Sequence, residues 1–137
     1  MSNTIFSMDE KVCLITGGSR GLGYAIAEAF FEAGAKRVYI TARKAEACEE
    51  AAKQLSKLGE CIAIPGDLSD VSEIDRLVSE LKQRETSIDV LVNNAGVGWL
   101  APLGEFPEKG WDKVMDLNVK TPFFLTQALR PLLINSA

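Results

Sequence analysis

A glycine-rich turn carries the clearest chemical signal in this sequence. Residues 16–23 read Thr-Gly-Gly-Ser-Arg-Gly-Leu-Gly and lie between an apolar run and a helical pattern. Gly17 can adopt a positive φ, Gly21 has no Cβ to block a phosphate, and Gly23 lets the following helix pack close to the sheet. Free N–H groups at the helix N-terminus attract phosphate. We expect the turn to cradle a pyrophosphate, and the alternative is a glycine-rich turn without a ligand.

Basic side chains stand where a second ligand contact is expected. Arg43 and Lys44 follow the apolar run at residues 38–41, and Ala42 occupies the position at which an acid typically holds the ribose 2′-hydroxyl of NAD. No carboxylate is therefore available there to repel a 2′-phosphate, while the Arg43 guanidinium can bind one through its planar fork. Arg20 in the glycine turn can reach the same phosphate. These residues predict a preference for NADP(H), and the alternative is an ordinary solvated loop.

Apolar runs of strand length alternate with helical patterns along the chain. Strands are expected at residues 11–16, 38–41, 61–65 and 89–92. Parallel strands need crossover connections, and right-handed crossovers place helices on both faces of the sheet. The predicted fold is a doubly wound parallel α/β sheet of Rossmann type, with the strands in the order third, second, first, fourth, followed by a long helix over about residues 111–133. Its ligand crevice is expected beyond the carboxyl ends of the first and fourth strands.

Apolar residues at helical spacing predict the buried face of each helix. The first helix is expected to bury Leu22, Ile26, Ala29, Phe30 and Ala33. The second is expected to bury Cys48, Ala51, Ala52, Leu55 and Leu58. The third, capped by Ser69 or Asp70, is expected to bury Val71, Ile74, Leu77, Val78 and Leu81. Aromatic residues near the long helix are expected to pack, against that helix or at an interface between subunits, rather than to line a substrate cleft, namely Trp99, Phe106, Trp111, Phe123 and Phe124.

Composition limits the domain count and the classes of function. The 137 residues, of which 47% are hydrophobic and 25% are charged, fit one globular domain, and a net charge of −4 gives no basic field for nucleic acid. The chain has no histidine and three dispersed cysteines (Cys13, Cys48 and Cys61), so we expect neither a metal site nor a disulfide framework. The absence of a signal-like leader and of a membrane-length apolar run indicates a cytoplasmic protein without a membrane partner.

Two motifs together resemble those of the short-chain dehydrogenase/reductase family. Residues 16–23 match that family's cofactor loop, and Asn93-Asn94-Ala95-Gly96 matches its second hallmark. Asp67-Leu68 resembles the family's adenine-contacting pair, and Asn118 resembles the asparagine of its catalytic tetrad. With the basic residues above, the cofactor-binding set becomes Gly17, Ser19, Arg20, Gly21, Leu22, Gly23, Arg43, Asp67, Leu68, Asn94, Ala95 and Gly96.

The resemblance implies an NADP(H)-dependent oxidoreductase that acts on a ketone or secondary alcohol. The amino-acid sequence between the motifs is similar to that of β-ketoacyl and polyketide reductases, rhamnolipid-type reductases included. The family's catalytic Ser, and its Tyr and Lys four residues apart, have no counterpart here, because neither Tyr24 nor Tyr39 is followed by Lys at the fourth position. We therefore expect residues 1–137 to form a single cofactor-binding domain that is truncated before a fifth strand and inactive alone.

Two other functions stay open beside this enzyme. One is a non-catalytic dinucleotide-binding module. The other is an interaction protein that pairs through the apolar edge of the strand at residues 90–92. The sequence also leaves open whether the protein forms a homo-oligomer.

Asn118 is the one residue with a polar amide side chain on a predicted helical stripe. The other members of the stripe are Val114, Thr121, Leu125, Ala128 and Leu132, so the amide of Asn118 is expected to be buried and in need of partners. Pro122 has no N–H to donate to the Asn118 carbonyl, which is therefore expected to stay free. The resemblance gives that carbonyl a role in a proton relay, and the alternative is a kink whose carbonyl is satisfied by a neighbouring side chain.

Overall fold

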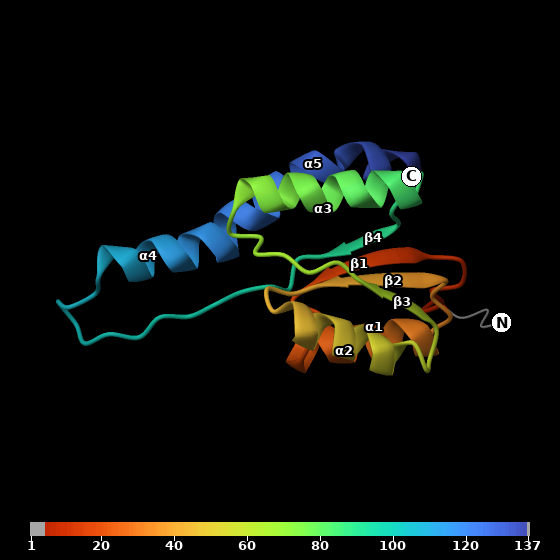
Figure 1. The fold of residues 1–137 in the computed structure, drawn as a ribbon, viewed down its shortest axis with the longest axis horizontal. Helices are drawn as coiled ribbons and strands as arrows, with labels where there is room; N and C mark the ends of the chain where they lie inside the picture. The colour runs from red at the N-terminus through yellow and green to blue at the C-terminus, as the bar shows by residue number, and fades with distance from the viewer. Residues whose placement is uncertain (1–4, 137) are drawn as a thin grey trace.

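A four-stranded parallel sheet forms the centre of the molecule (Figure 1). The structure, a computed structural model, describes residues 5–136. The strands are β1 (Val12–Thr16), β2 (Arg37–Thr41), β3 (Glu60–Ala63) and β4 (Val90–Val92), and they lie in the order β3-β2-β1-β4. This order and the parallel pairing confirm the predicted sheet.

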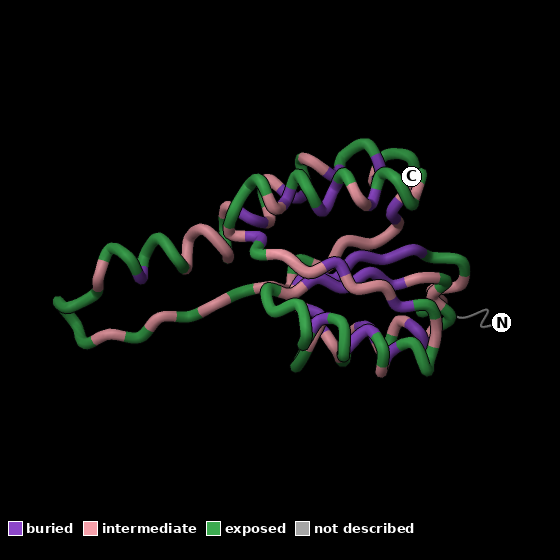
Figure 2. Tube along the Cα trace, in the orientation of Figure 1, coloured by how far each residue is buried: buried purple, intermediate pink, exposed green. Residues whose placement is uncertain are grey.

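Helices cover both faces of this sheet, as the crossover argument predicts. α1 (Gly21–Glu32) and α2 (Ala45–Leu55) lie on one face, and α3 (Val71–Arg84) and α5 (Thr121–Ser136) lie on the other (Figure 1). Alternate strand residues point to the two faces, so Cys13 and Ile15 belong to one apolar core and Val12 and Leu14 to the other. Burial is accordingly concentrated along the strands and the inward sides of the helices (Figure 2).

The predicted buried face of the first helix is confirmed only in part, since Ile26 and Phe30 are partly buried and pack against the core, whereas Leu22 and Ala29 are exposed. Leu22 is 76% exposed, and the buried residues of α1 are Gly23, Ala27 and Phe31, one every four positions. The cause is Gly23, whose missing Cβ lets the helix rest against the Gly17 carbonyl and so sets which side faces the sheet. In the other two helices the prediction fails only at Leu58, which lies beyond α2, and at Val71 in the first turn of α3.

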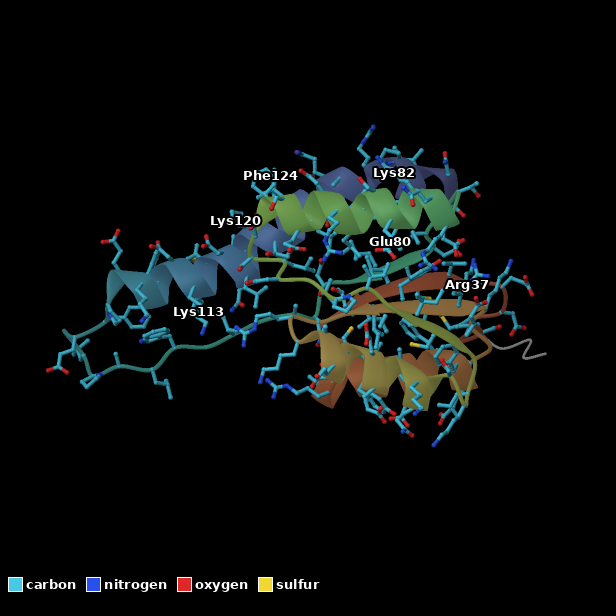
Figure 3. All side chains as sticks on the ribbon, in the orientation of Figure 1. Arg37, Glu80, Lys82, Lys113, Lys120 and Phe124 are labelled. Atoms are coloured by element: carbon cyan, nitrogen blue, oxygen red, sulfur yellow. The ribbon has the colours of Figure 1, made fainter. Side chains whose placement is uncertain are left out.

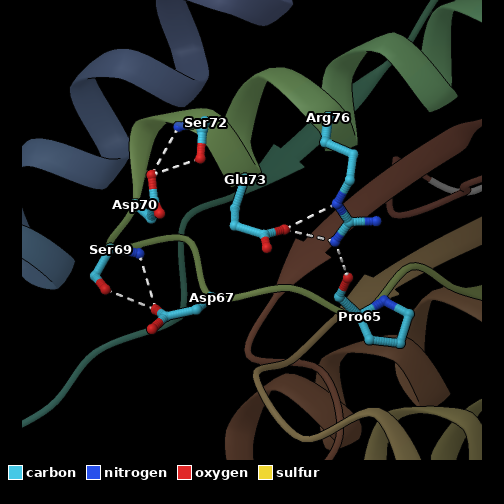
Figure 4. Close-up of polar contacts among 7 residues, drawn as sticks. All are labelled: Pro65, Asp67, Ser69, Asp70, Ser72, Glu73 and Arg76. Carbon is cyan, nitrogen blue, oxygen red and sulfur yellow. Dashed lines mark hydrogen bonds and ion pairs between the residues drawn. The ribbon is translucent and has the colours of Figure 1, made fainter.

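Asp70 is the N-cap of α3, one of the two residues predicted for that role. Its Oδ1 accepts hydrogen bonds from the Ser72 amide at 2.9 Å and the Ser72 hydroxyl at 2.8 Å (Figure 4). These hydrogen bonds lower the pKa of the Asp70 carboxyl. The other predicted candidate, Ser69, instead donates to Asp67 in the preceding turn.

The long C-terminal helix is interrupted by a π-helical turn. Its segments are α4 (Glu108–Met115), the π turn η1 (Asp116–Lys120) and α5. Pro122 lies just after η1, and its ring would clash with the Asn118 carbonyl in a regular α-helix, which accounts for the wider turn at this place. The loop after β4 runs alongside helix α4. Together they form an arm that projects from the sheet (Figure 1).

Asp89, directly before β4, ties three segments together at the amino end of the sheet. Its Oδ2 accepts a hydrogen bond from Val12 N at 2.7 Å, and its Oδ1 accepts one from Ser136 Oγ at 2.6 Å. Burial disfavours the charged carboxylate, but these hydrogen bonds and the charges of Lys11 and Lys36 outweigh it and hold the pKa of Asp89 below its ordinary value.

Acid is expected to remove the contribution of Asp89 to stability. A carboxylate with a depressed folded-state pKa stabilises the fold above its unfolded pKa, and the contribution is lost as the pH falls through the folded value. The free energy of unfolding of Asp89→Asn should therefore change less between about pH 5 and 2 than that of the unmodified chain. Urea titrations measure this, with the exposed Asp75→Asn on α3 as the control. Equal pH dependence of Asp89→Asn and the unmodified chain would contradict the assignment.

Candidate functional site

A cleft of about 750 Å³ lies beyond the carboxyl ends of the strands. It is lined by most of the predicted cofactor-binding residues, namely Gly17, Ser19, Arg20, Gly21, Arg43, Asp67, Leu68, Asn94, Ala95 and Gly96. Leu22 and Gly23 are not among its lining residues, since Leu22 points to solvent and Gly23 is buried beneath the turn. The topology thus gathers residues from four separate connections into one concave site, as doubly wound sheets do at this edge.

The glycine turn has the backbone geometry that the sequence predicts. Gly17 has a φ of 66° and Gly21 a φ of 57°, both in the left-handed region that favours glycine. A Cβ on Gly21 would meet nothing within 4 Å, so this residue faces open space. A Cβ on Gly23 would overlap the Gly17 carbonyl oxygen and approach Asn94 Nδ2 to 2.7 Å. The first is a position open to a ligand, and the second is a point of close packing.

Free backbone donors face the cleft from the start of α1. Within residues 5–136, no side chain caps this helix, and no acidic residue lies in its first turn. The positive end of the helix is therefore neither neutralised nor blocked by the chain itself. A helix end of this kind, preceded by a glycine-rich turn, can bind a phosphate group.

Thr16 locks the glycine turn to the segment that follows β4. Its Oγ1 accepts hydrogen bonds from Asn94 N at 3.0 Å and Ala95 N at 2.9 Å, and donates to Val92 O at 3.4 Å. The Asn94 side chain donates to Gly17 O at 3.1 Å. The two sequence hallmarks are thus one hydrogen-bonded unit. The predicted site set omits Thr16, although its place at the head of the glycine motif could have signalled this role.

The basic residues that the sequence singles out lie at the cleft. Arg20 and Arg43 both line it, and Lys44 lies beside them. No acid follows β2 directly, because Ala42 occupies that position. The predicted Asp67 also lines the cleft, but its Oδ1 already accepts from Ser69 N at 3.1 Å and Ser69 Oγ at 2.6 Å (Figure 4).

Leu68 combines a cleft position with a place in the core. It is 4% exposed, and its carbonyl accepts a hydrogen bond from the Thr121 hydroxyl at 2.5 Å. The same hydroxyl donates to Asp116 O at 2.9 Å, which ties the connection after β3 to the π turn. This arrangement fixes an apolar wall of the cleft against α5.

Asn118 is paired but not buried, which corrects the expectation of a buried amide. The residue is exposed, and its amide makes two hydrogen bonds of 2.9 Å with the backbone of Val97, one donated and one accepted. The π turn shifts Asn118 off the buried stripe, whose members on α5 are Thr121, Leu125, Leu129 and Leu132. Its contact holds the chain just after Gly96 at the mouth of the cleft.

One wall of the cleft comes from residues that the sequence analysis does not assign. Lys113, Asp116 and Leu117 approach it from α4 and η1, and Lys120 pairs with Asp116 Oδ1 at 3.2 Å (Figure 3). The remaining unassigned lining residues are Thr41, Ala42, Lys44, Ala47, Gly66, Ser69 and Val97. Lys113, Asp116 and Leu117 reach the site only because the fold brings α4 and η1 beside it, and no local sequence motif marks them.

The aromatic residues of the arm pack less than expected. Trp99 lies against Gly110 of α4, where a Cβ would come within 2.7 Å of the indole ring, and the ammonium groups of Lys109 and Lys113 each lie 5.8 Å from its centroid. Phe124 packs against the core. Phe106, Trp111 and Phe123 pack little within the single chain, where their exposed fractions are 48%, 60% and 63%.

Neither the tyrosines nor the cysteines are among the residues that line the cleft. The Tyr39 hydroxyl donates to Glu85 Oε1 at 2.8 Å, and Glu85 also pairs with Arg37, which Figure 3 labels at the amino end of β2. Burial and Glu85 raise the pKa of Tyr39. The cysteines are buried and free, as predicted, and burial raises the pKa to about 12 for Cys13, about 11 for Cys48 and about 12 for Cys61.

The described part of the chain offers neither a metal-binding cluster nor a membrane-spanning helix. Among residues 5–136, no three His, Cys, Asp or Glu side chains are grouped so that they could hold a metal ion. None of the helices in that range combines the length and the apolar character needed to cross a membrane.

Known proteins share both the sequence and the architecture of this chain. The rhamnolipids biosynthesis 3-oxoacyl-(acyl-carrier-protein) reductase of Pseudomonas aeruginosa is 50% identical over 132 residues, which are 96% of this chain and 51% of that protein. The solved P. aeruginosa RhlG/NADP active-site complex is 49% identical, with a TM-score of 0.92 over 96% of this chain and 51% of that one. L-sorbose reductase from Gluconobacter frateurii, solved with NADPH and L-sorbose, is 30% identical. Its TM-score is 0.88, over 95% of this chain and 50% of that one.

A family model extends this likeness to most of the sequence. The chain spans about half the length of the relatives named above. The model that describes short chain dehydrogenases matches residues 11–137, which include the glycine turn, the segment after β4 and Asn118. The chain therefore belongs to the short chain dehydrogenase family.

Proposed function

We propose that the cleft binds NADP(H) and that residues 1–137 form a single dinucleotide-binding domain. The observation that carries the proposal is the meeting of three features in one cleft. These are the uncapped N-terminus of α1 behind Gly17 and Gly21, the guanidinium groups of Arg20 and Arg43, and the absence of a carboxylate directly after β2. The P. aeruginosa and G. frateurii structures, which are complexes with NADP and NADPH, support the same cofactor.

Each part of the cofactor has a proposed set of contacts. The pyrophosphate binds the glycine turn, including Ser19, and the start of α1. The 2′-phosphate binds Arg43 and Arg20, and the adenine binds beside Asp67 and Leu68. The nicotinamide half extends towards Asn94, Ala95 and Gly96, which Thr16 holds in place.

The activity that we propose for the whole protein is an oxidoreductase acting on a ketone or secondary alcohol. The bound cofactor supplies the hydride chemistry, and the protein orients the reactants. Asn118 and Val97 fix the mouth of the cleft, and we propose that Pro122 leaves the Asn118 carbonyl free to join a proton relay. A cytoplasmic location and assembly into homo-oligomers are further parts of the proposal that rest on the sequence.

The 137-residue polypeptide is expected to bind NADPH without turnover. A second candidate function, a non-catalytic binding module, is favoured by the place of Tyr39, which donates to Glu85 and is not among the residues that line the cleft. Purified chain mixed with NADPH should show a change in nicotinamide fluorescence, while NADPH absorbance stays constant after ketones, including a 3-oxoacyl thioester, are added. Consumption of NADPH would refute the expected inactivity, and absence of a fluorescence change would count against the binding proposal.

A further inference from the structure

Thr41, the last residue of β2, has a buried hydroxyl without a hydrogen-bond partner. The residue is 1% exposed, and its Oγ1 meets no donor or acceptor among residues 5–136. No other buried side-chain nitrogen or oxygen in that range is left unpaired. Because buried polar groups in folded proteins are almost always hydrogen-bonded, an orphan of this kind calls for a specific cause.

The neighbouring Thr16 shows that a threonine at the buried end of a strand need not have an unpaired hydroxyl. Thr16 and Thr41 are register partners at the ends of β1 and β2, and both are 1% exposed. Strand alternation places both side chains on the sheet face that α3 and α5 cover, with Leu14 and Tyr39. The Thr16 hydroxyl has three backbone partners, whereas the Thr41 hydroxyl has none. The difference lies in what surrounds each hydroxyl.

The surroundings of Thr41 are the cleft. It is a lining residue together with Gly17, Gly66 and Arg43. Its backbone is fixed, because its carbonyl accepts hydrogen bonds from Gly17 N at 2.9 Å and Gly18 N at 3.2 Å. The side chain keeps one degree of freedom, since rotation about χ1 exchanges the hydroxyl with the methyl group. The hydroxyl can therefore turn towards a ligand in the cleft while the glycine turn stays in place.

We infer that the Thr41 hydroxyl is an additional binding group for the adenosine half of NADP(H), an inference that rests on the function proposed above. Thr41 lies two residues before Arg43 and beside Gly66, on the side of the cleft assigned to the 2′-phosphate and the adenine. A polar atom of that half supplies the partner that the hydroxyl lacks. The ligand-free protein thus carries an unpaired group that binding satisfies.

Two substitutions of Thr41 separate this role from a structural one. Thr41→Val keeps the shape and removes the hydroxyl, and Thr41→Ser keeps the hydroxyl and removes the methyl group. Loss of one hydrogen bond to the ligand should raise the Kd for NADPH by about fivefold or more in Thr41→Val, while Thr41→Ser stays within about twofold of the unmodified chain. The adenosine-half probe 2′,5′-ADP should show the same loss. Ligand-free Thr41→Val should melt no lower than the unmodified chain, because no hydrogen bond is broken.

Each other outcome overturns a defined claim. Unchanged affinity of Thr41→Val for NADPH and 2′,5′-ADP would show that the hydroxyl does not contact the ligand. A lower Tm of ligand-free Thr41→Val would show that the hydroxyl bonds an internal partner and acts structurally. If the unmodified chain bound neither probe, the proposed function would fail as well, and that result is distinct from a loss confined to the variant.

Discussion

Aspartate at position 42 is expected to reverse the dinucleotide preference of the chain. Ala42→Asp places a carboxylate directly after β2, beside the position proposed for the 2′-phosphate, while the same carboxylate can accept hydrogen bonds from the ribose hydroxyls of NADH. Repulsion between like charges a few ångströms apart near a protein surface amounts to several kcal/mol, so the Kd for NADPH should rise by about 100-fold or more. The Kd for NADH should fall several-fold. Calorimetric titration of both cofactors measures the two changes.

Two arginine variants make this result specific to the 2′-phosphate. Arg43→Ala removes the proposed guanidinium contact and should weaken NADPH about tenfold or more while leaving NADH nearly unchanged. Arg84→Ala removes an exposed arginine on α3 that pairs with Glu80 and does not line the cleft, so it should change neither cofactor. If Arg43→Ala weakened NADPH and NADH equally, the 2′-phosphate would have to be assigned to other residues.

A methyl group at position 23 is expected to disrupt the site from beneath. In Gly23→Ala the new Cβ would overlap the Gly17 carbonyl oxygen and crowd Asn94 Nδ2 at 2.7 Å, and both neighbours are held by hydrogen bonds. Overpacking of this kind costs about 1–3 kcal/mol, so Tm should fall by several degrees. Because the displaced atoms belong to the glycine turn, NADPH affinity should fall as well, by about tenfold or more. Thermal unfolding and NADPH titration measure the two effects.

Gly98→Ala is the matched control for this substitution. A Cβ on Gly98 meets nothing within 4 Å, and its φ lies outside the left-handed region, so both stability and affinity should stay close to those of the unmodified chain. Gly21→Ala tests a different cause, because space is open there but φ is 57°. It should be strained by about 1–2 kcal/mol without any steric overlap inside the protein. A Gly23→Ala chain as stable as Gly98→Ala would refute the close-packing role of Gly23.

The sheet and its strand order follow from the sequence, but the orientation of α1 does not. Short apolar runs separated by helical patterns leave few topologies open, since crossovers must be right-handed. Apolar periodicity then fails in α1 because Ala and Phe recur around the helix, and the contact of Gly23 with Gly17 decides which side is buried. The π turn at Asp116–Lys120 could not be predicted either. Pro122 shows where a regular helix is obstructed, but not that the chain responds with a wider turn.

The site shows the same division between local and tertiary information. Residues in compact motifs, such as Arg20 and Asn94, can be assigned because neighbours in the sequence are neighbours in the cleft. Lys113 enters the site only through the path of α4, which no motif encodes. The unpaired hydroxyl of Thr41 is even harder to predict from the sequence, because the lack of a hydrogen bond depends on all the surrounding atoms together.

Titration of the unmodified chain with NADPH and with NADH, under identical conditions in a calorimeter, tests the central claim most directly. With Arg20 and Arg43 on the cleft and no carboxylate directly after β2, NADPH should bind with a Kd at least about tenfold lower than NADH. Equal affinities, or tighter binding of NADH, would contradict the assignment of these guanidinium groups to a 2′-phosphate.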